Sequence, residues 1–184
     1  FFGRDDLTTQ LVERMNEKGD LRRFLAVIGP SGSGKSSVVK AGLLPALRQG
    51  AVDNSAAWFY VEMFPGTQPF EELEAALLHV ATAPVPNLME TLRSDARGLV
   101  RAVKQILPRD TDNELLIVID QFEEIFTLVE DEEERQLFLY NLYQAVMDER
   151  SRIRIVVTLR ADFYDKPLMY GGVGNLIRQR TEVV

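Results

Sequence analysis

The sequence has 184 residues, of which 46% are hydrophobic and 27% are charged, and this composition excludes disordered and fibrous proteins. It has no cysteine and one histidine, which excludes disulfides and thiolate metal sites and argues against zinc. With 21 basic and 28 acidic residues the net charge is −7, so we expect no direct nucleic-acid binding. No apolar run approaches the roughly 18 residues of a membrane span, so we expect no membrane association, and the lack of cysteine favours a cytoplasmic location.

The first half of the sequence alternates between amphipathic helical patterns and short apolar runs. The predicted elements are a helix over 5–18, a strand over 24–28, a glycine-rich turn, a helix from 34 to 44, a strand over 58–64 and a helix over 70–80. Pro45 is expected to break or kink the second helix, because proline lacks the N–H that a helix interior needs.

The second half continues the alternation after a proline-containing loop. It predicts two helical stretches before Pro108, a strand over 115–120, a helix over 132–149, a strand over 153–159, three glycines before a short helix within 170–180, and the start of a last strand over 181–184. Strands that alternate with helices are typical of an α/β fold with a mainly parallel sheet. We therefore expect one α/β domain.

The eight residues after the first predicted strand carry the strongest chemical signal. They read Gly29-Pro30-Ser31-Gly32-Ser33-Gly34-Lys35-Ser36 and match G-x-x-x-x-G-K-[ST] at every specified position. Glycines allow successive backbone N–H groups to point at phosphate oxygens, and the following helix adds the positive end of its dipole. Lys35 supplies a charge to the β- and γ-phosphates, and Ser36 offers a hydroxyl to Mg²⁺. These residues and the adjacent Ser37 are the predicted nucleotide-binding set.

A second group of candidate residues follows the apolar run 115–119. Asp120 comes directly after this run, and an aspartate at such a strand end holds Mg²⁺ in phosphate-loop proteins. Glu123 and Glu124 follow, and a carboxylate there could orient or deprotonate a water that attacks the γ-phosphate, with Glu123 preferred. The alternative is that both are solvated acids in the first turn of a helix, where the helix dipole favours them.

The third candidate is Arg160, which ends the predicted strand before it. If that strand lies between the two strands that carry Lys35 and Asp120, the guanidinium would lie near the γ-phosphate. It could then distinguish bound ATP from bound ADP and stabilise the negative charge that develops on the γ-phosphate. Without that placement, Arg160 is a surface cation.

Five segments occur in an order that resembles a known family. They are Phe2-Gly3-Arg4-Asp5, the run 37–45 after the phosphate loop, Pro65-Gly66, the run 120–126, and the run 158–164 that begins Thr158-Leu159-Arg160. Together they resemble the novel STAND NTPases of bacteria, which are signal transduction ATPases with numerous domains, often fused to WD-repeats or other sensor arrays. The last two segments are specific to that group, and the resemblance spans almost the whole chain.

The resemblance implies a P-loop NTPase fold of the additional-strand class, with about five parallel strands in the order 5-1-4-3-2 and the last strand truncated. It implies that Phe2, Gly3 and Arg4 lie against the base and ribose and that Arg160 is a sensor. It also implies a switch that is closed with ADP and opens and oligomerises with ATP. We therefore expect ATP or ADP and Mg²⁺ as cofactors, and homo-oligomers that depend on nucleotide.

The resemblance also implies that residues 1–184 are the P-loop core of a longer multidomain chain. The sequence begins without an initiator methionine, which favours the same interpretation. The expected partners are then sensor and effector domains of that longer chain. One departure from the family pattern is Gln121, where many relatives carry an acid, so the water-positioning role falls to Glu123 or Glu124.

Two other functions remain open beside a slow regulatory ATPase. A small-molecule kinase would need a second substrate pocket and an arginine-rich lid, for which Arg178 and Arg180 are the late candidates. A scaffold that binds nucleotide without hydrolysing it is disfavoured by the intact Lys35, Ser36 and Asp120. The sequence lacks the N-K-x-D motif that reads guanine, so ATP is favoured over GTP.

Overall fold

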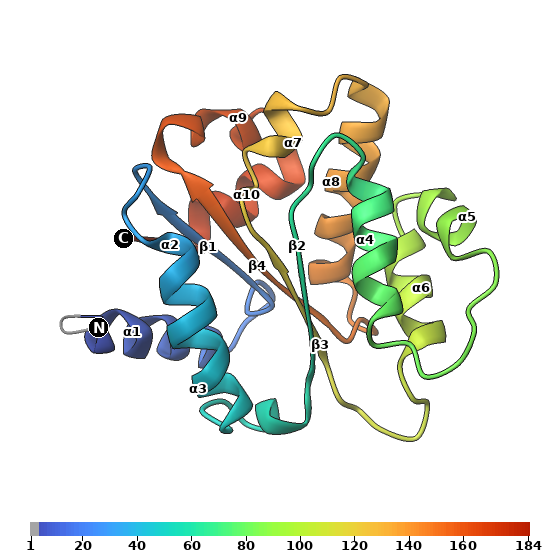
Figure 1. Cartoon of the computed structure of the whole chain (residues 1–184), viewed down its shortest axis with the longest axis horizontal. Coiled ribbons are helices and arrows are strands. Elements are labelled where there is room, and N and C mark those ends of the chain that lie inside the picture. Colours follow the sequence, from blue (N-terminus) through green and yellow to red (C-terminus); the bar gives the residue numbers. More distant parts are fainter. Residues whose placement is uncertain (1–3) are drawn as a thin grey trace.

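A computed structural model describes residues 4–184 and shows a parallel sheet between two layers of helices (Figure 1). The strands are β1 (Phe24–Gly29), β2 (Phe59–Met63), β3 (Leu115–Ile119), β4 (Ile153–Arg160) and β5 (Thr181–Val183). They are arranged β2-β3-β4-β1-β5, and every neighbouring pair is parallel. Counted from the β5 edge, this is the predicted order 5-1-4-3-2.

The helices cover both faces of this sheet. One face carries α1 (Asp5–Asn16), α2 (Lys35–Ser37), a π-helical turn (Val38–Leu43) and α3 (Leu44–Arg48). The other carries α4 (Pro69–Leu78), α5 (Leu88–Arg93), α6 (Gly98–Ile106), α8 (Glu132–Met147) and α10 (Gly171–Gln179). The short elements are α7 (Glu124–Thr127), α9 (Asp165–Leu168) and two 3₁₀ turns (Ser55–Ala57 and Ala161–Phe163). None of the helices in the described part of the chain is long and apolar enough to cross a membrane.

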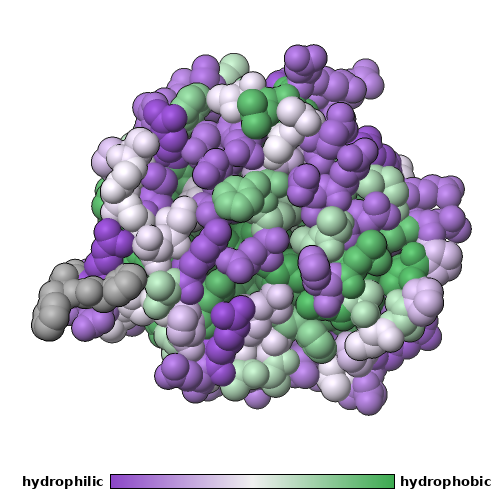
Figure 2. Space-filling model, in the orientation of Figure 1, coloured by the Kyte–Doolittle hydropathy of each residue, from purple (hydrophilic) through white to green (hydrophobic). Residues whose placement is uncertain are grey.

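The central strands are apolar without a break because both of their faces are buried. In β1, Phe24, Ala26 and Ile28 pack into the core on the α8 side. The intervening Leu25 and Val27 pack into the core beneath α1 and α3. The outer surface is mostly hydrophilic on the side seen in Figure 1, with hydrophobic residues near its middle and towards α4 (Figure 2). The apolar residues therefore gather mainly in the two interfaces between sheet and helices.

The helix after the phosphate loop does not end at Pro45, which was one of the two predicted outcomes, because it continues to Arg48. The preceding residues Val38–Leu43 form a π-helical turn, in which the N–H of Leu44 donates to the carbonyl of Val39. Pro45 then lies in the first turn of α3, where a missing N–H costs little. The proline is thus accommodated by a change of helix type rather than by a helix end.

The glycines near the C-terminal end lie inside α10, whereas the sequence pattern placed them before a helix. A Cβ at Gly172 would lie 2.7 Å from the ring of Tyr143 in α8, and one at Gly174 would lie 3.0 Å from the Cα of Leu168. The missing side chains therefore allow α10 to pack closely against α8 and α9, which outweighs the low helix propensity of glycine.

A buried asparagine in α8 ties this helix to α6. The Asn141 side chain is fully buried, its Oδ1 accepts the N–H of Leu99, and its Nδ2 donates to the carbonyls of Asp95 and Leu137. We expect Asn141→Leu to lower the free energy of unfolding by about 2–3 kcal/mol, because it leaves buried backbone groups unpaired. Urea denaturation measures this value. The same substitution at Asn175, whose side chain accepts a hydrogen bond from exposed Gln179, should change the free energy of unfolding by less than about 0.5 kcal/mol.

Candidate nucleotide-binding site

The phosphate loop joins β1 to α2 at the carboxyl edge of the sheet. Gly32 and Gly34 have φ angles of 75° and 89°, which a residue with a Cβ adopts only under strain. The Lys35 side chain is buried, and its Nζ donates to the carbonyl of Pro30 at 2.9 Å. The ammonium group is therefore enclosed by the loop, where it can meet phosphate oxygens together with the backbone N–H groups.

The N-terminal segment packs against this loop through Arg4. Its guanidinium donates to the carbonyls of Ser33 and Gly34 at 3.2 and 3.3 Å, and a Cβ at Gly34 would overlap it. Phe2 and Gly3 lie outside the described residues, so their contact with the base and ribose stays a prediction.

A buried carboxylate lies next to the loop. Asp120 follows β3, and its Oδ1 accepts hydrogen bonds from Ser36 Oγ at 2.7 Å and Thr158 Oγ1 at 2.6 Å. Its Oδ2 lies 2.9 Å from Lys40 Nζ. Burial alone would raise the pKa of Asp120, but these hydrogen bonds and the Lys40 charge outweigh it and hold the pKa below its usual value. The carboxylate is therefore ionised at neutral pH.

The donor set at this point fits Mg²⁺. Asp120 and Ser36 supply a carboxylate and a hydroxyl, which are the hard oxygen ligands that Mg²⁺ prefers. Within residues 4–184, no group of three or more histidine, cysteine or acidic side chains could hold a metal by itself. A Mg²⁺ ion here would therefore need phosphate oxygens and waters to complete its coordination, as it does in nucleotide sites.

Two residues of this cluster were missed by the sequence interpretation. Lys40 follows Ser36 by four residues, and this spacing puts both side chains on one face of a helix. Thr158 is the lone polar residue within the apolar run 155–159, and its hydroxyl also accepts the N–H of Gln121 at 2.9 Å. Gln121 itself has a φ of 60°, so the chain turns sharply after Asp120.

The two adjacent glutamates have different surroundings. Glu123 is buried, and its Oε2 accepts the backbone N–H of Arg160 at 3.3 Å. The Oε2 of Glu124 instead accepts the N–H of Gly66 at 2.7 Å, in the loop after β2. The Glu123 carboxyl group therefore lies beside the phosphate loop and β4, while that of Glu124 secures a neighbouring loop.

Arg160 ends β4, which pairs with β1 on one side and with β3 on the other. The strand therefore does lie between the strand that leads into the phosphate loop and the strand that Asp120 follows. Its guanidinium pairs with Asp162 at 2.7 Å and lies 5.2 Å from the centre of the Phe163 ring. The placement that the sensor hypothesis needs is present, and the sensor role itself stays a prediction.

These elements surround one cavity of about 290 Å³ at the carboxyl ends of the strands. Its lining is Ser31, Gly32, Lys35, Ser36, Gln121, Glu123, Thr158 and Arg160. In parallel α/β sheets, ligands bind outside the carboxyl ends of the strands, where the order of strands reverses. Candidate residues from the phosphate loop, from the turn after β3 and from the end of β4 thus meet in one place.

The family model described as nSTAND1, Novel STAND NTPase 1, matches residues 1–184. The chain belongs to this family. The resemblance carried by the sequence motifs is therefore confirmed, and the nSTAND1 chain is a nucleotide-binding NTPase module. No curated protein matches the sequence.

The chain is similar to several solved structures, two of which were solved with nucleotides. The Aeropyrum pernix ORC2 protein, solved in ADPNP–ADP complexes, has a TM-score of 0.56 at 12% identity, with the match covering 100% of the nSTAND1 chain and 48% of ORC2. The conjugation coupling protein TcpA of pCW3, solved with ATPγS, has a TM-score of 0.45 at 19% identity and coverages of 84% and 46%. The cytoplasmic domain of the Thermomonospora curvata type VII secretion ATPase EccC has a TM-score of 0.43 at 16% identity and coverages of 87% and 19%. The nSTAND1 chain thus spans less than half of each of these proteins.

Proposed function

We propose that this chain binds ATP with Mg²⁺, hydrolyses it slowly and acts as the nucleotide switch of a longer signal-transduction protein. The observation that carries the proposal is the single cavity in which the phosphate loop, Glu123 and Arg160 meet, with Asp120 hydrogen-bonded to Ser36 of its lining. Membership of a STAND NTPase family supports the same conclusion.

Each residue has a defined role in the proposal. Lys35 and the loop N–H groups bind the β- and γ-phosphates. Ser36 and Asp120 would hold Mg²⁺, which neutralises charge on the phosphate oxygens when it is bound. Glu123 orients the attacking water and accepts its proton, and Arg160 stabilises negative charge on the γ-phosphate.

Slow turnover is supported by the contacts that these two groups make within the protein. The Arg160 guanidinium is held by Asp162 and the Phe163 ring, and the Glu123 carboxylate accepts the Arg160 N–H. Both side chains must exchange these contacts before they act on a phosphate or a water. A conformational requirement of this kind is typical of a switch, in which exchange between states rather than chemistry limits the rate.

The proposed setting is the core of a larger bacterial protein in the cytoplasm, with sensor and effector domains on the same chain and homo-oligomers that form with ATP. The family description supports a role within a signalling chain. The lack of cysteine agrees with a reducing compartment.

The kinase alternative is weakened by the position of Arg180, one of its two candidate lid residues. Arg180 is buried and donates to the carbonyls of Phe24 and Arg14, while also pairing with Glu17. Its guanidinium therefore joins β5 to β1 and α1 and is not available to cover a substrate.

The test is to incubate the chain with Mg²⁺ and either ATP or GTP, to measure affinity by calorimetry and to identify the products. We expect preference for ATP, and ADP with inorganic phosphate as the products. Transfer of the phosphoryl group to an added metabolite would instead establish a kinase. Binding without any release of phosphate over many hours would establish a scaffold.

A further inference from the structure

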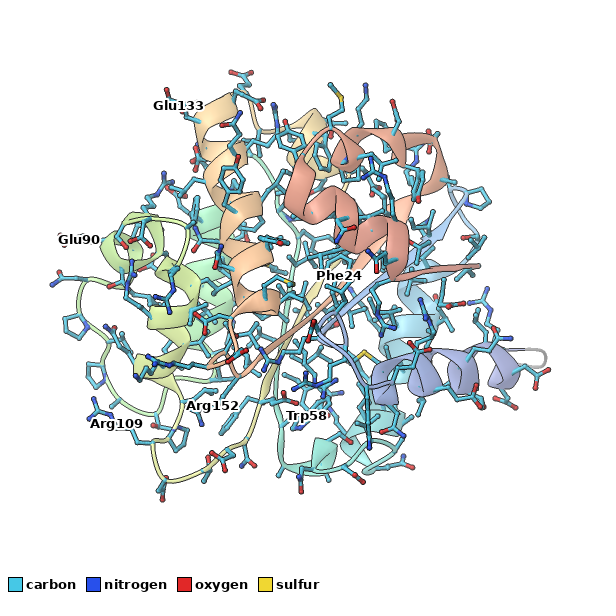
Figure 3. The ribbon with its side chains drawn as sticks, turned by 180° about the vertical axis from the view of Figure 1, so that it is seen from behind. Phe24, Trp58, Glu90, Arg109, Glu133 and Arg152 are labelled. Atoms are coloured by element: carbon cyan, nitrogen blue, oxygen red, sulfur yellow. The ribbon has the colours of Figure 1, made fainter. Side chains whose placement is uncertain are left out.

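A second and larger cavity lies at the opposite edge of the sheet, near the amino ends of β3 and β4. It measures about 580 Å³ and is formed by α6, the loop 108–112 and the turn 150–152. Figure 3 shows Arg109 and Arg152 together at this end of the molecule. The basic residues of the lining are Arg97, Arg101, Lys104, Arg109, Arg150 and Arg152.

This concentration of positive charge stands out in a chain whose net charge is −7. Among the residues that line the cavity, Asp112 is the single acid. Two of the six cations are neutralised by ion pairs, Arg97 with Asp148 at 2.5 Å and Arg101 with Asp95 at 2.7 Å.

The other four cations have no such partner. Within residues 4–184, no carboxylate oxygen lies within 4 Å of the charged nitrogens of Lys104, Arg109, Arg150 or Arg152. Surface cations are usually dispersed among acids, because clustering like charges costs energy. A group of four from three segments is therefore a surface on which an anion would be stabilised.

The cavity is also ordered by its own contacts. Arg152 Nη1 donates to the carbonyls of Pro108 and Thr111 at 3.1 and 2.5 Å, which holds the loop 108–112 against the start of β4. The hydroxyl of Thr111, another lining residue, is buried and has no hydrogen-bond partner among the described residues. A buried hydroxyl without a partner is costly, and this one lies in the loop that forms one wall of the cavity.

We propose that this cavity binds a small anion that carries two or more phosphate groups. Its volume lies in the range of small-molecule sites, which is roughly 300–1,000 Å³. A guanidinium group can donate two parallel hydrogen bonds to two oxygens of one phosphate or carboxylate group. Several cations around one small ligand are balanced only if the ligand carries more negative charge than a single carboxylate. Free polyphosphate and the phosphate tail of a nucleotide share this chemistry.

The site is separate from the nucleotide cavity, because the two lie at opposite ends of the strands and share no lining residue. A ligand here would contact the turn before β4, the strand that ends in Arg160. The chain would then hold two phosphate-binding sites on the same strand, one at each end.

The test is an amide NMR titration of the isotope-labelled chain with sodium tripolyphosphate and, in parallel, with ATP. We expect the amide signals of Thr111 and Ser151 to shift saturably as one set, which reports the basic cavity. We expect the amide signal of Gly32 to shift as a second set, which reports the nucleotide cavity. Arg109→Ser combined with Arg150→Ser should weaken the first set by about tenfold or more and leave the second unchanged. Both arginines are exposed, so the folded structure tolerates their loss.

The control is Lys18→Ser combined with Arg178→Ser, which removes the same charge at exposed positions outside the cavity lining. It should leave both sets of shifts unchanged. Shifts at Thr111 with tripolyphosphate alone identify free polyphosphate, and shifts with both ligands identify a phosphate tail. The proposal is overturned by an absence of saturable shifts at Thr111 and Ser151, or by shifts that survive the double substitution. Saturable binding of a polyglutamate peptide without binding of tripolyphosphate would overturn it too.

Discussion

Replacing Lys35 with alanine is expected to weaken ATP binding by about tenfold to a hundredfold. The Lys35 ammonium is buried within the phosphate loop, and its present partner is the carbonyl of Pro30. A hydrogen bond to a charged group contributes about 1.5–3 kcal/mol, and about 1.4 kcal/mol corresponds to a tenfold change in affinity. Calorimetry with ATP and Mg²⁺ measures the loss.

The matched control for this variant is Lys18→Ala, which removes an exposed lysine just after α1. Its affinity for ATP should equal that of the unchanged protein. Thermal unfolding separates loss of binding from loss of structure, because Lys35 also contacts the loop itself. Unchanged affinity in a folded Lys35→Ala protein would refute the assignment of the phosphate site.

Replacing Glu123 with glutamine is expected to lower the rate of ATP hydrolysis by about 10²- to 10³-fold while ATP affinity changes little. A general base contributes about 10²- to 10⁴-fold to a rate, and the amide cannot accept a proton from water. The amide oxygen can still accept the N–H of Arg160, so the local structure is preserved. Release of inorganic phosphate under saturating ATP measures the rate.

The comparison with Glu124→Gln decides between the two neighbouring acids. Glu124 accepts the N–H of Gly66, and a glutamine oxygen can do the same, so this variant should lose far less activity than Glu123→Gln. If instead Glu124→Gln loses activity and Glu123→Gln retains it, the water-positioning role belongs to Glu124.

Most of the fold follows from local sequence patterns. The apolar run 115–119 and the run before the phosphate loop are long enough and pure enough to be strands with two buried faces. The predicted strand order is confirmed, although it came from the family resemblance. Periodicity alone does not order parallel strands, because each pairing joins segments far apart in the sequence.

The errors in the helices have a common cause in packing. The sequence pattern used the intrinsic preferences of Pro45 and of the glycines near residue 172, and both preferences were outweighed by tertiary contacts. A π-helical turn takes up the proline, and the absence of a side chain at Gly172 lets α10 approach Tyr143. Local propensity amounts to about 1 kcal/mol for a glycine, which close packing readily exceeds.

The sequence by itself determined the chemistry of the phosphate loop, because its eight consecutive residues impose backbone torsions and charge locally. Only the tertiary structure decided which other residues join it. Lys40 and Thr158 lie on different elements, yet both contact Asp120, and Glu123 rather than Glu124 faces the cavity. The tertiary structure also revealed the basic cavity, whose lining residues are spread along the sequence from Arg97 to Arg152. Such groups meet because parallel strands bring distant segments to a common edge, a relation that no single stretch of sequence contains.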